Sequence, residues 1–433
     1  MDREKKYIQK RRWKGRVQSI PFYLCRLRPI RKRKIVFCCI EGTTGYTCNP
    51  KYIAEELIRR DAGYELVWLV NDVSKKFPEQ IKVVRNTLWN RAYHLSTARF
   101  WIDNSRKQLE ARKRKGQIYI QTWHAKLGFK PTCLDRGASF SKMAYLVSKH
   151  DSDMIDYVLS NSKWYDDTLP TGMIYDGPVL RTGSPRCDIL VNDREEGRRR
   201  VRERYGLAED VKIIMYAPTF RGGSQGTDRT VETGQGFPDY GRLIKALEER
   251  FGGEWCVFLR LHPQLVARNL DLDVTGVLIS DRAEMHGRSK GQKPGREGRA
   301  GQIAGGEKHS EEMPVYRKIV DVSRIDDMYE VLAGCDAFMT DYSSAAFDAA
   351  VMRVPVLLYA EDYGEYERER GKLLWNLREL PFPLAQDDGE LERQILGFQD
   401  ERYQAKLKNL FRETEMVEDG KAAGRVAEAL AVL

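Results

Sequence analysis

The sequence predicts an α/β protein made of two Rossmann-like domains that face a cleft. Short apolar runs alternate with stretches of helical spacing in both halves of the chain, and glycine-bearing or polar turns follow the runs. The 433 residues are enough for two such domains. In sheets of this kind, ligands bind beyond the carboxyl ends of the strands.

The first half contains the opening unit of a doubly wound domain. An apolar run at 35–40 is followed by a glycine-bearing turn and then by a segment with helical spacing. The pattern continues with strands expected at 64–70, 99–104 and 116–124. A charged, helix-like segment over 193–205 marks the boundary, so we expect an N-terminal domain over 35–192.

The second half repeats the pattern. We expect strands at 211–220, 255–263, 276–280, 337–341 and 354–360, and helices at 239–250 and 326–333. These elements predict a C-terminal domain over 205–390, with further helices over 391–433. Residues 281–314 hold seven glycines and almost no large apolar residues, which predicts a mobile insertion. His286 and His309 lie inside it and are set aside.

Basic residues are concentrated at the start of the chain. Residues 1–34 hold fourteen Lys or Arg and two acids, whereas the whole chain has a net charge of only +10. Apolar residues such as Trp13 and Leu24 alternate with these charges, and Pro21 is expected to divide the segment into two pieces. The composition favours an amphipathic arm on an anionic membrane surface. A solvated tail is the alternative; nucleic-acid binding is disfavoured because no recognisable module follows.

Other features limit the class of protein. No apolar run reaches the length that a membrane span requires, and the N-terminus lacks the pattern of a secretory signal. The eight cysteines show no metal-ligand spacing, so we expect reduced thiols, no metal and no cofactor. The protein is expected to face the cytoplasm and to bind the cell membrane peripherally.

Two histidines and a serine pair follow predicted strands. His124 and His262 each end a strand, where an imidazole serves as a general base or binds phosphate. Each is equally compatible with a structural role. Ser343 and Ser344 open a helix whose free N–H groups favour an anion, although Ser is also a common helix cap.

Seven segments in order resemble one known family. The sequence resembles the CDP-glycerol glycerophosphotransferases, which include the wall teichoic acid primases and polymerases. The segments are GTTGYTCNPKYIAEEL (42–57), QTWHAKLGFK (121–130), TGSPRCDIL (182–190), YAPTFR (216–221), RLHP (260–263), DVSRIDDMYEVLAGCDAFMTDYSSAAFD (321–348) and PVLLYAEDYGEYERERG (355–371).

The resemblance implies a GT-B-like fold with a CDP-linked donor held mainly by the C-terminal domain. Carried over motif by motif, the implied donor contacts are His124, Ala125, Lys126, Leu127, Gly128, Arg186, Pro218, Thr219, Arg260, Leu261, His262, Ser343, Ser344 and Asp348. The chain departs from the family pattern at Ala125, where many relatives have Gly, and at Cys187, where Asn is frequent.

The implied reaction is transfer of glycerol phosphate from CDP-glycerol to a lipid-linked polyprenyl-diphosphate acceptor, with release of CMP. His124 is the expected general base, and His262 is expected to assist at the diphosphate. A CDP-ribitol donor is the nearest alternative, followed by a nucleotide-sugar glycosyltransferase and by a membrane scaffold without activity.

Overall fold

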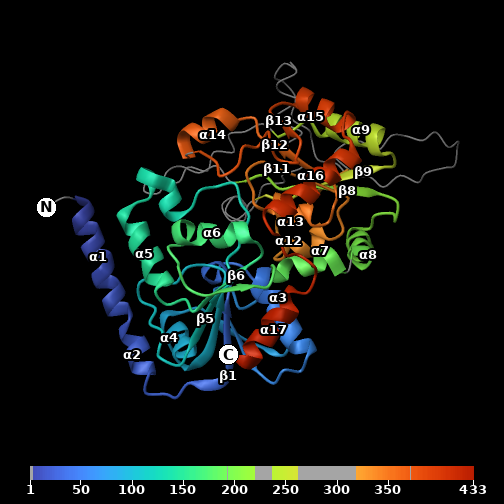
Figure 1. Cartoon of the computed structure of the whole chain (residues 1–433). Coiled ribbons are helices and arrows are strands. Elements are labelled where there is room, and N and C mark those ends of the chain that lie inside the picture. Colours follow the sequence, from blue (N-terminus) through green and yellow to red (C-terminus); the bar gives the residue numbers. More distant parts are fainter. Residues whose placement is uncertain (1–2, 193, 220–236, 262–317, 371) are drawn as a thin grey trace, which may run out of the picture.

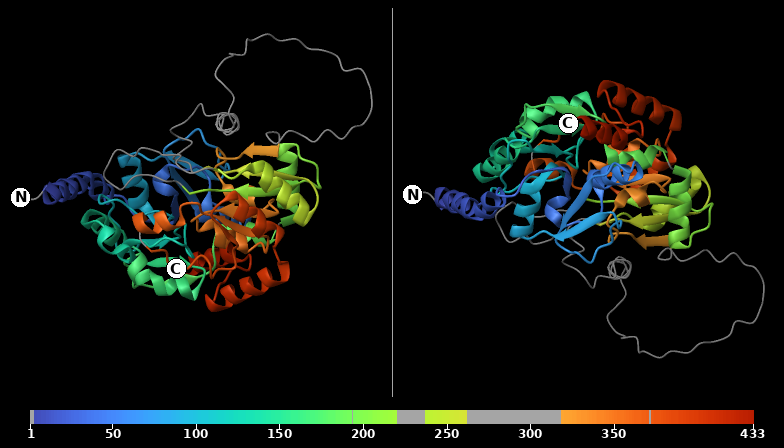
Figure 2. Two further views of the ribbon diagram at one scale, coloured as in Figure 1. Left: turned by 90° about the horizontal axis from the view of Figure 1, so that it is seen from above. Right: turned by 90° about the horizontal axis from the view of Figure 1, so that it is seen from below.

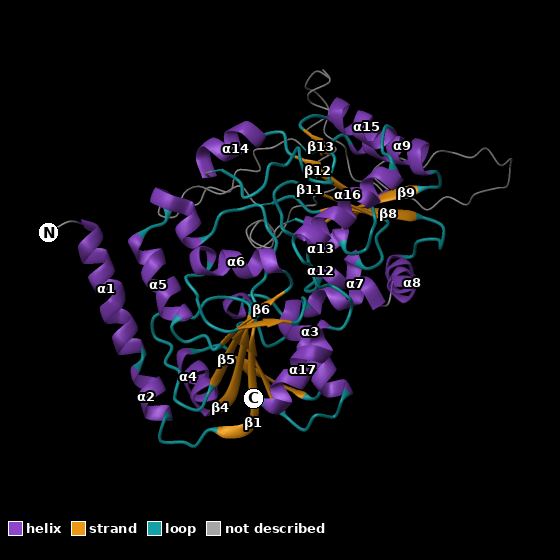
Figure 3. Ribbon diagram, viewed as in Figure 1, coloured by secondary structure: helices purple, strands orange, loops and turns teal. Residues whose placement is uncertain are grey.

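The structure is a computed structural model that describes residues 3–192, 194–219, 237–261, 318–370 and 372–433. It contains two separate parallel sheets (Figures 1 and 3). We call the part of the chain around the first sheet the N-terminal lobe and the part around the second sheet the C-terminal lobe. The prediction of an α/β protein with two Rossmann-like parts is confirmed.

The first sheet has seven strands in the order β3-β2-β1-β4-β5-β6-β7, and all pairs are parallel. The strands are β1 (Arg31–Cys38), β2 (Glu65–Val70), β3 (Ile81–Arg85), β4 (Ala98–Asp103), β5 (Ile118–Gln121), β6 (Tyr157–Ser160) and β7 (Val179–Arg181). The sequence predicted β1, β2, β4 and β5 within a few residues. It missed β3, β6 and β7, which are short or contain charged residues.

Both faces of the first sheet are covered by helices. Along β1, Ile35 and Phe37 pack on one face while Val36 and Cys38 pack on the other. This is why β1 has a continuous apolar run. The helices of this lobe are α2 (Ile20–Cys25), α3 (Cys48–Arg59), α4 (Leu88–Thr97), α5 (Lys142–Ser152) and α6 (Lys163–Gly172).

The second sheet has six parallel strands in the order β10-β9-β8-β11-β12-β13. They are β8 (Lys212–Tyr216), β9 (Trp255–Leu259), β10 (Ile319–Asp321), β11 (Ala337–Thr340), β12 (Val356–Tyr359) and β13 (Leu384–Ala385). The helices are α7 (Asp188–Asn192), α8 (Arg194–Tyr205), α9 (Tyr240–Phe251), α12 (Met328–Leu332), α13 (Ala345–Ala350), α14 (Tyr363–Arg370), α15 (Asp388–Leu396) and α16 (Asp400–Glu413). The expected strand at 276–280 and the insertion at 281–314 lie outside the described residues.

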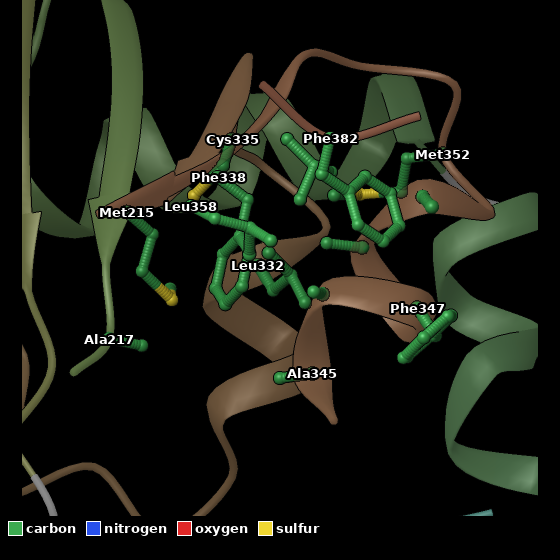
Figure 4. Packing of buried hydrophobic residues seen from close by; sticks show 14 of the residues in the cluster. Met215, Ala217, Leu332, Cys335, Phe338, Ala345, Phe347, Met352, Leu358 and Phe382 are labelled. Atoms are coloured by element: carbon green, nitrogen blue, oxygen red, sulfur yellow. The ribbon is translucent and has the colours of Figure 1, made fainter. Parts of the chain in front are cut away.

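The core of the C-terminal lobe lies between this sheet and its helices. Figure 4 shows Met215 and Phe338 from two strands beside Leu332 of α12, and Phe347 of α13 lies farther away in the same cluster. Leu127 and Phe129 of the N-terminal lobe belong to the same buried cluster. The two lobes therefore share apolar packing.

The end of the chain returns to the first lobe. After α16, α17 (Ala422–Val432) packs against α3, and the two helices lie side by side in Figure 1. Val426 and Leu430 are buried among side chains of the first sheet. The C-terminal helices expected over 391–433 thus serve both lobes.

The N-terminal segment forms two helices, α1 (Arg3–Gln18) and α2, with Pro21 in the first turn of α2. α1 extends along the edge of the N-terminal lobe (Figures 1 and 2). Strand β1 begins at Arg31, four residues before the predicted start. Lys34 is fully buried in it, and its Nζ donates to Thr97 Oγ1 at 2.7 Å. Among the described residues, none of the helices is long and apolar enough to cross a bilayer.

Candidate active site

His124 lies just after β5 and is held by one hydrogen bond. Its Nδ1 is 2.9 Å from the carbonyl oxygen of Asn104, which follows β4. Because a carbonyl only accepts, Nδ1 carries the proton and Nε2 has the free lone pair. The residue is exposed to solvent on one side, yet dense protein surrounds it elsewhere. That burial, together with Arg186 and Arg106, lowers the pKa of His124 below its usual value, so the ring is neutral at pH 7.

The backbone around His124 is fixed by its neighbours. Trp123 has a φ of +48°, a left-handed conformation that costs energy for a bulky residue. Gln121 accepts the Trp123 N–H at 3.0 Å, and Asn49 Nδ2 donates to the Trp123 carbonyl at 2.9 Å. The guanidinium of Arg106 lies 4.6 Å from the Trp123 ring centroid. These contacts fix the backbone that carries the imidazole.

Arg186 and Asp348 form a buried ion pair between the lobes. Arg186 Nη2 lies 2.7 Å from Asp348 Oδ2, and Arg186 Nη1 donates to the carbonyl of His124 at 2.6 Å. Tyr329 also donates to Asp348, at 2.5 Å. The sequence predicted both residues as donor contacts. In the structure they contact each other, so a direct contact with donor stays a prediction.

The segment that follows His124 enters the space between the lobes. Lys126 is buried, and its Nζ donates to Gly183 O and Ser184 Oγ, both at 3.0 Å. A Cβ added at Gly128 would lie 3.6 Å from the Cβ of Ser344, so these two predicted residues are neighbours across the lobes. Ala125, half-buried, packs beside the core of the N-terminal lobe.

Ser343 and Ser344 immediately precede helix α13, whereas the sequence placed them in the first turn of the helix. Ser344 is the N-terminal cap position, but its hydroxyl makes no capping hydrogen bond. Ser343 Oγ accepts the Ala345 N–H at 3.3 Å. Capping therefore accounts for Ser343 and leaves the Ser344 hydroxyl available at the interface with Gly128.

Arg260 follows β9 and holds the loop at 322–325. Its Nη1 donates to the carbonyls of Val322, Ser323 and Ile325 at 2.7, 2.8 and 2.6 Å. The backbone N–H of Leu261 donates to Ser323 Oγ at 2.8 Å. The sequence predicted Arg260 and Leu261 as donor contacts; the structure assigns them at least this scaffolding role. His262 lies outside the described residues.

Thr219 and Pro218 follow β8 and lie beside the end of β11. Asp341 accepts from the Thr219 backbone N–H and from its hydroxyl, both at 2.9 Å. Asp341 directly follows β11 and lies two residues before Ser343. The ends of β8 and β11 are thus joined next to the predicted anion site.

A second polar contact joins the lobes beside the loop that Arg260 holds. Asp327, which is 2% exposed, accepts from Lys51 Nζ and from the hydroxyl of Tyr52, both at 2.7 Å. Lys75 pairs with the neighbouring Asp326. These contacts tie α3 and the loop after β2 to the 322–327 loop.

Several residues of this site were missed by the sequence reasoning. Asn104 orients His124, Asn49 holds the loop before it, and Asp341 fixes Thr219. The signal available for Asn104 and Asp341 was their position at the last residue of predicted strands. Nothing in the sequence indicated that Asn49, in the first turn of α3, reaches the end of β5.

The geometry can be compared with known proteins. The sequence model of the family described as CDP-glycerol:poly(glycerophosphate) glycerophosphotransferase matches residues 21–286 and 308–431. The chain belongs to this family. The match omits 287–307, which lie within the expected insertion.

Relatives with curated descriptions are teichoic acid enzymes. A teichoic acid poly(glycerol phosphate) polymerase of Staphylococcus epidermidis is 26% identical over 93% of this chain and 51% of its own length. A polymerase of the same description from Bacillus spizizenii is 22% identical, with 96% of each chain covered. The chain spans about half the length of the Staphylococcus epidermidis and Bacillus subtilis polymerases.

Solved structures show the same fold. The wall teichoic acid polymerase TagF superimposes with a TM-score of 0.74 at 22% identity, over 100% of this chain and 98% of that one. The expected GT-B-like fold is confirmed.

Proposed function

We propose that this chain transfers glycerol phosphate from CDP-glycerol to a hydroxyl group of a teichoic acid-type acceptor and releases CMP. Membership of the family and the neutral, oriented imidazole of His124 support this proposal. The observation that carries it is the free Nε2 of His124 in a loop that meets Ser344 across the lobes.

The reaction balances without a cofactor. The acceptor oxygen attacks the phosphorus that bears glycerol, and its proton passes to His124 Nε2. The bond from that phosphorus to the oxygen of the CMP phosphate breaks, and the electron pair leaves with CMP. A base with a lowered pKa is already unprotonated at neutral pH, so no prior deprotonation is needed.

The C-terminal lobe supplies the donor side in this proposal. The Ser344 hydroxyl binds the diphosphate, and Thr219 is a further donor contact on the same side. His262, which lies outside the described residues, is the remaining donor contact that the family pattern implies. Arg260, Arg186 and Asp348 shape the same region through the contacts described above.

The acceptor is proposed to be lipid-linked, and the N-terminal helices are proposed to hold the enzyme on the cytoplasmic face of the cell membrane. Trp13 and Val17 lie four residues apart on α1, Ile20 and Leu24 lie four residues apart on α2, and Leu27 is in the turn that follows α2. All five are exposed, Trp13 by 67% and Leu27 by 87%. Helix α4, which packs against α2, adds the exposed Trp89. Apolar side chains among many cations suit an anionic lipid surface.

The proposed reaction is tested by supplying alternative donors. The purified protein is incubated with CDP-glycerol, CDP-ribitol and a panel of UDP-sugars, each with a lipid-linked acceptor, and nucleotide release is measured. We expect CMP from CDP-glycerol in the wild type and none from the His124→Ala variant, which should still bind the donor. Full turnover in that variant would exclude His124 as the base.

CDP-ribitol remains the second candidate donor. Teichoic acid ribitol-phosphate polymerases are among the relatives, at 23–25% identity. A preference for CDP-ribitol in the same assay would change the substrate and leave the chemistry intact. Release of UDP from a sugar donor would instead indicate a glycosyltransferase.

A further inference from the structure

Glu418 lies in the segment that leads from α16 back to the N-terminal lobe. This segment is bonded to the end of β6 and to the start of α6. Val417 N donates to Asn161 O at 2.7 Å, and Trp164 N donates to Thr414 O at 3.3 Å. Glu418 Oε1 accepts from Asn161 Nδ2 at 2.9 Å, and Oε2 accepts from the Ser184 N–H at 3.0 Å. The carboxylate thus joins two separate turns of the lobe.

One of those turns leads directly to the candidate base. Ser184 Oγ accepts from Lys126 Nζ at 3.0 Å, and Lys126 is two residues from His124. Two residues after Ser184, Arg186 donates to the carbonyl of His124 at 2.6 Å. The turn at 183–186 therefore holds the His124 loop at two points.

The fit between the returning segment and this turn is close. Gly183 has a φ of +90°, and a Cβ added there would lie 2.7 Å from Val417 O and 3.3 Å from Glu418 Oε2. A side chain at 183 would push the returning segment away. The glycine is required here by both its conformation and the approach of Glu418.

We propose that Glu418 is a positioning residue for the transfer reaction: by holding the 183–186 turn, it fixes Lys126 and Arg186, and through them the backbone that carries His124. The inference rests on the proposed role of His124 as the base. Glu418 does not contact substrate in this account. It makes the final part of the chain a component of the active-site support.

Charge supports the same assignment. Burial lowers the pKa of Lys126 to about 8. The negative charge of Glu418 is the largest influence that raises this pKa. Burial in turn raises the pKa of Glu418 to about 7, against the effect of Lys126 and the bonds from Ser184 and Asn161. Arg186, Cys187 and Asp348 are the other charged or titratable groups that act on Lys126. The carboxylate and the ammonium each favour the charged form of the other.

The test compares Glu418→Gln with Glu415→Gln as a matched control. The side-chain amide of Gln has only one oxygen, and its NH2 group cannot accept a hydrogen bond from Ser184 N or from Asn161 Nδ2. At least one of the two hydrogen bonds is therefore lost. Glu415 lies on the same segment, but its side chain is 62% exposed and pairs with Arg181 at the surface. Hydrogen–deuterium exchange of peptides covering 121–130 and 182–187 is measured in both variants and in wild type. We expect faster exchange only in Glu418→Gln.

Turnover provides the second measurement. With CDP-glycerol and acceptor, we expect kcat of Glu418→Gln to fall by about tenfold or more, because small displacements of a catalytic group are costly, while donor KM changes little. Glu418→Asp keeps the charge and should recover part of the loss. In wild type, kcat should fall as the pH drops below about 7, and this fall should be absent in Glu418→Gln.

The outcomes separate this inference from the proposed function. Unchanged exchange at 121–130 in Glu418→Gln overturns the inference, whatever the substrate is. Faster exchange with unchanged kcat overturns it as well. If the wild-type protein releases no CMP from CDP-glycerol, the proposed function fails, and the exchange measurement still decides whether Glu418 fixes this loop.

Discussion

Arg186 and Asp348 form an ion pair of 2.7 Å that is almost completely removed from solvent and joins the two lobes. The same guanidinium bonds the backbone of His124, and Asp348 belongs to the helix that follows the serine pair. One pair of side chains therefore sets the spacing between the candidate base and the proposed donor pocket.

Loss of either member of this pair should destabilise the protein strongly. Asp348→Ala or Arg186→Ala leaves a buried charge without its partner, which costs about 3–5 kcal/mol. The double variant should be less destabilised than the sum of the two single variants, because neither charge then remains. Urea unfolding of the three variants checks this. Additive losses would mean that the two side chains contribute independently.

Asp327→Asn should weaken the second interlobe contact. Lys51 is buried beside Asp327, and its charge would lose its main counter-charge. We expect a loss of about 2–4 kcal/mol in unfolding free energy, with a higher KM for donor because the 322–327 loop is released. Lys149→Gln, which removes an exposed pair with Asp153, is the control and should change stability by less than about 1 kcal/mol.

Arg260→Lys should impair donor binding although it keeps the positive charge. All three carbonyls are bonded by Nη1, and a lysine side chain is shorter than that of arginine, so its ammonium should not reach them and the 322–325 loop should loosen. We expect donor KM to rise by about tenfold with a smaller change in kcat. The measurement is initial rate against CDP-glycerol concentration. An unchanged KM would show that the loop does not determine donor affinity.

The N-terminal helices should bind anionic vesicles through both charge and apolar contact. Trp13→Ser combined with Leu27→Ser removes the two most exposed large apolar residues between Arg3 and Leu27, and we expect binding to fall by about tenfold. Raising the salt concentration should weaken the binding of the wild type as well. Sedimentation with vesicles measures both effects. Leu396→Ser, a partly exposed site on α15, should have no effect.

Stability should fall in mild acid because of His94. Burial, and then Lys34, lowers the pKa of this buried histidine to about 4. The unfolded chain, with a pKa near 6.5, binds the proton first, so stability is present above that pH and is lost as the pH falls toward 4. Between pH 7.5 and 5, we expect the unfolding free energy of His94→Gln to fall by about 2 kcal/mol less than that of the wild type. Equal sensitivity in urea unfolding would contradict this.

The sequence was sufficient to predict the two α/β lobes and the position of His124, because buried strands and the polar residues after them are local patterns. The sequence correctly placed Arg260 at a strand end, but it did not predict the carbonyl groups that Arg260 bonds. The carbonyls that it bonds lie 62–65 residues later in the chain, and no local pattern connects them.

The start of β1 illustrates a different limit. Arg31, Lys32 and Arg33 appeared to belong to the basic arm, yet they are exposed residues of the strand, and Lys34 is buried. A lysine is compatible with a strand interior when a hydroxyl oxygen such as that of Thr97 accepts a hydrogen bond from its Nζ. The partner is 63 residues away, so the pattern of charge alone indicated a tail.

Helix α17 has a consequence for the order of events during synthesis. Val426 and Leu430 fill the core beneath the first sheet, although that sheet is complete by residue 181. A growing chain on the ribosome therefore exposes an unfinished apolar surface until the C-terminal lobe has emerged and the final helix has been made. Chaperone occupancy of nascent chains should persist throughout this interval.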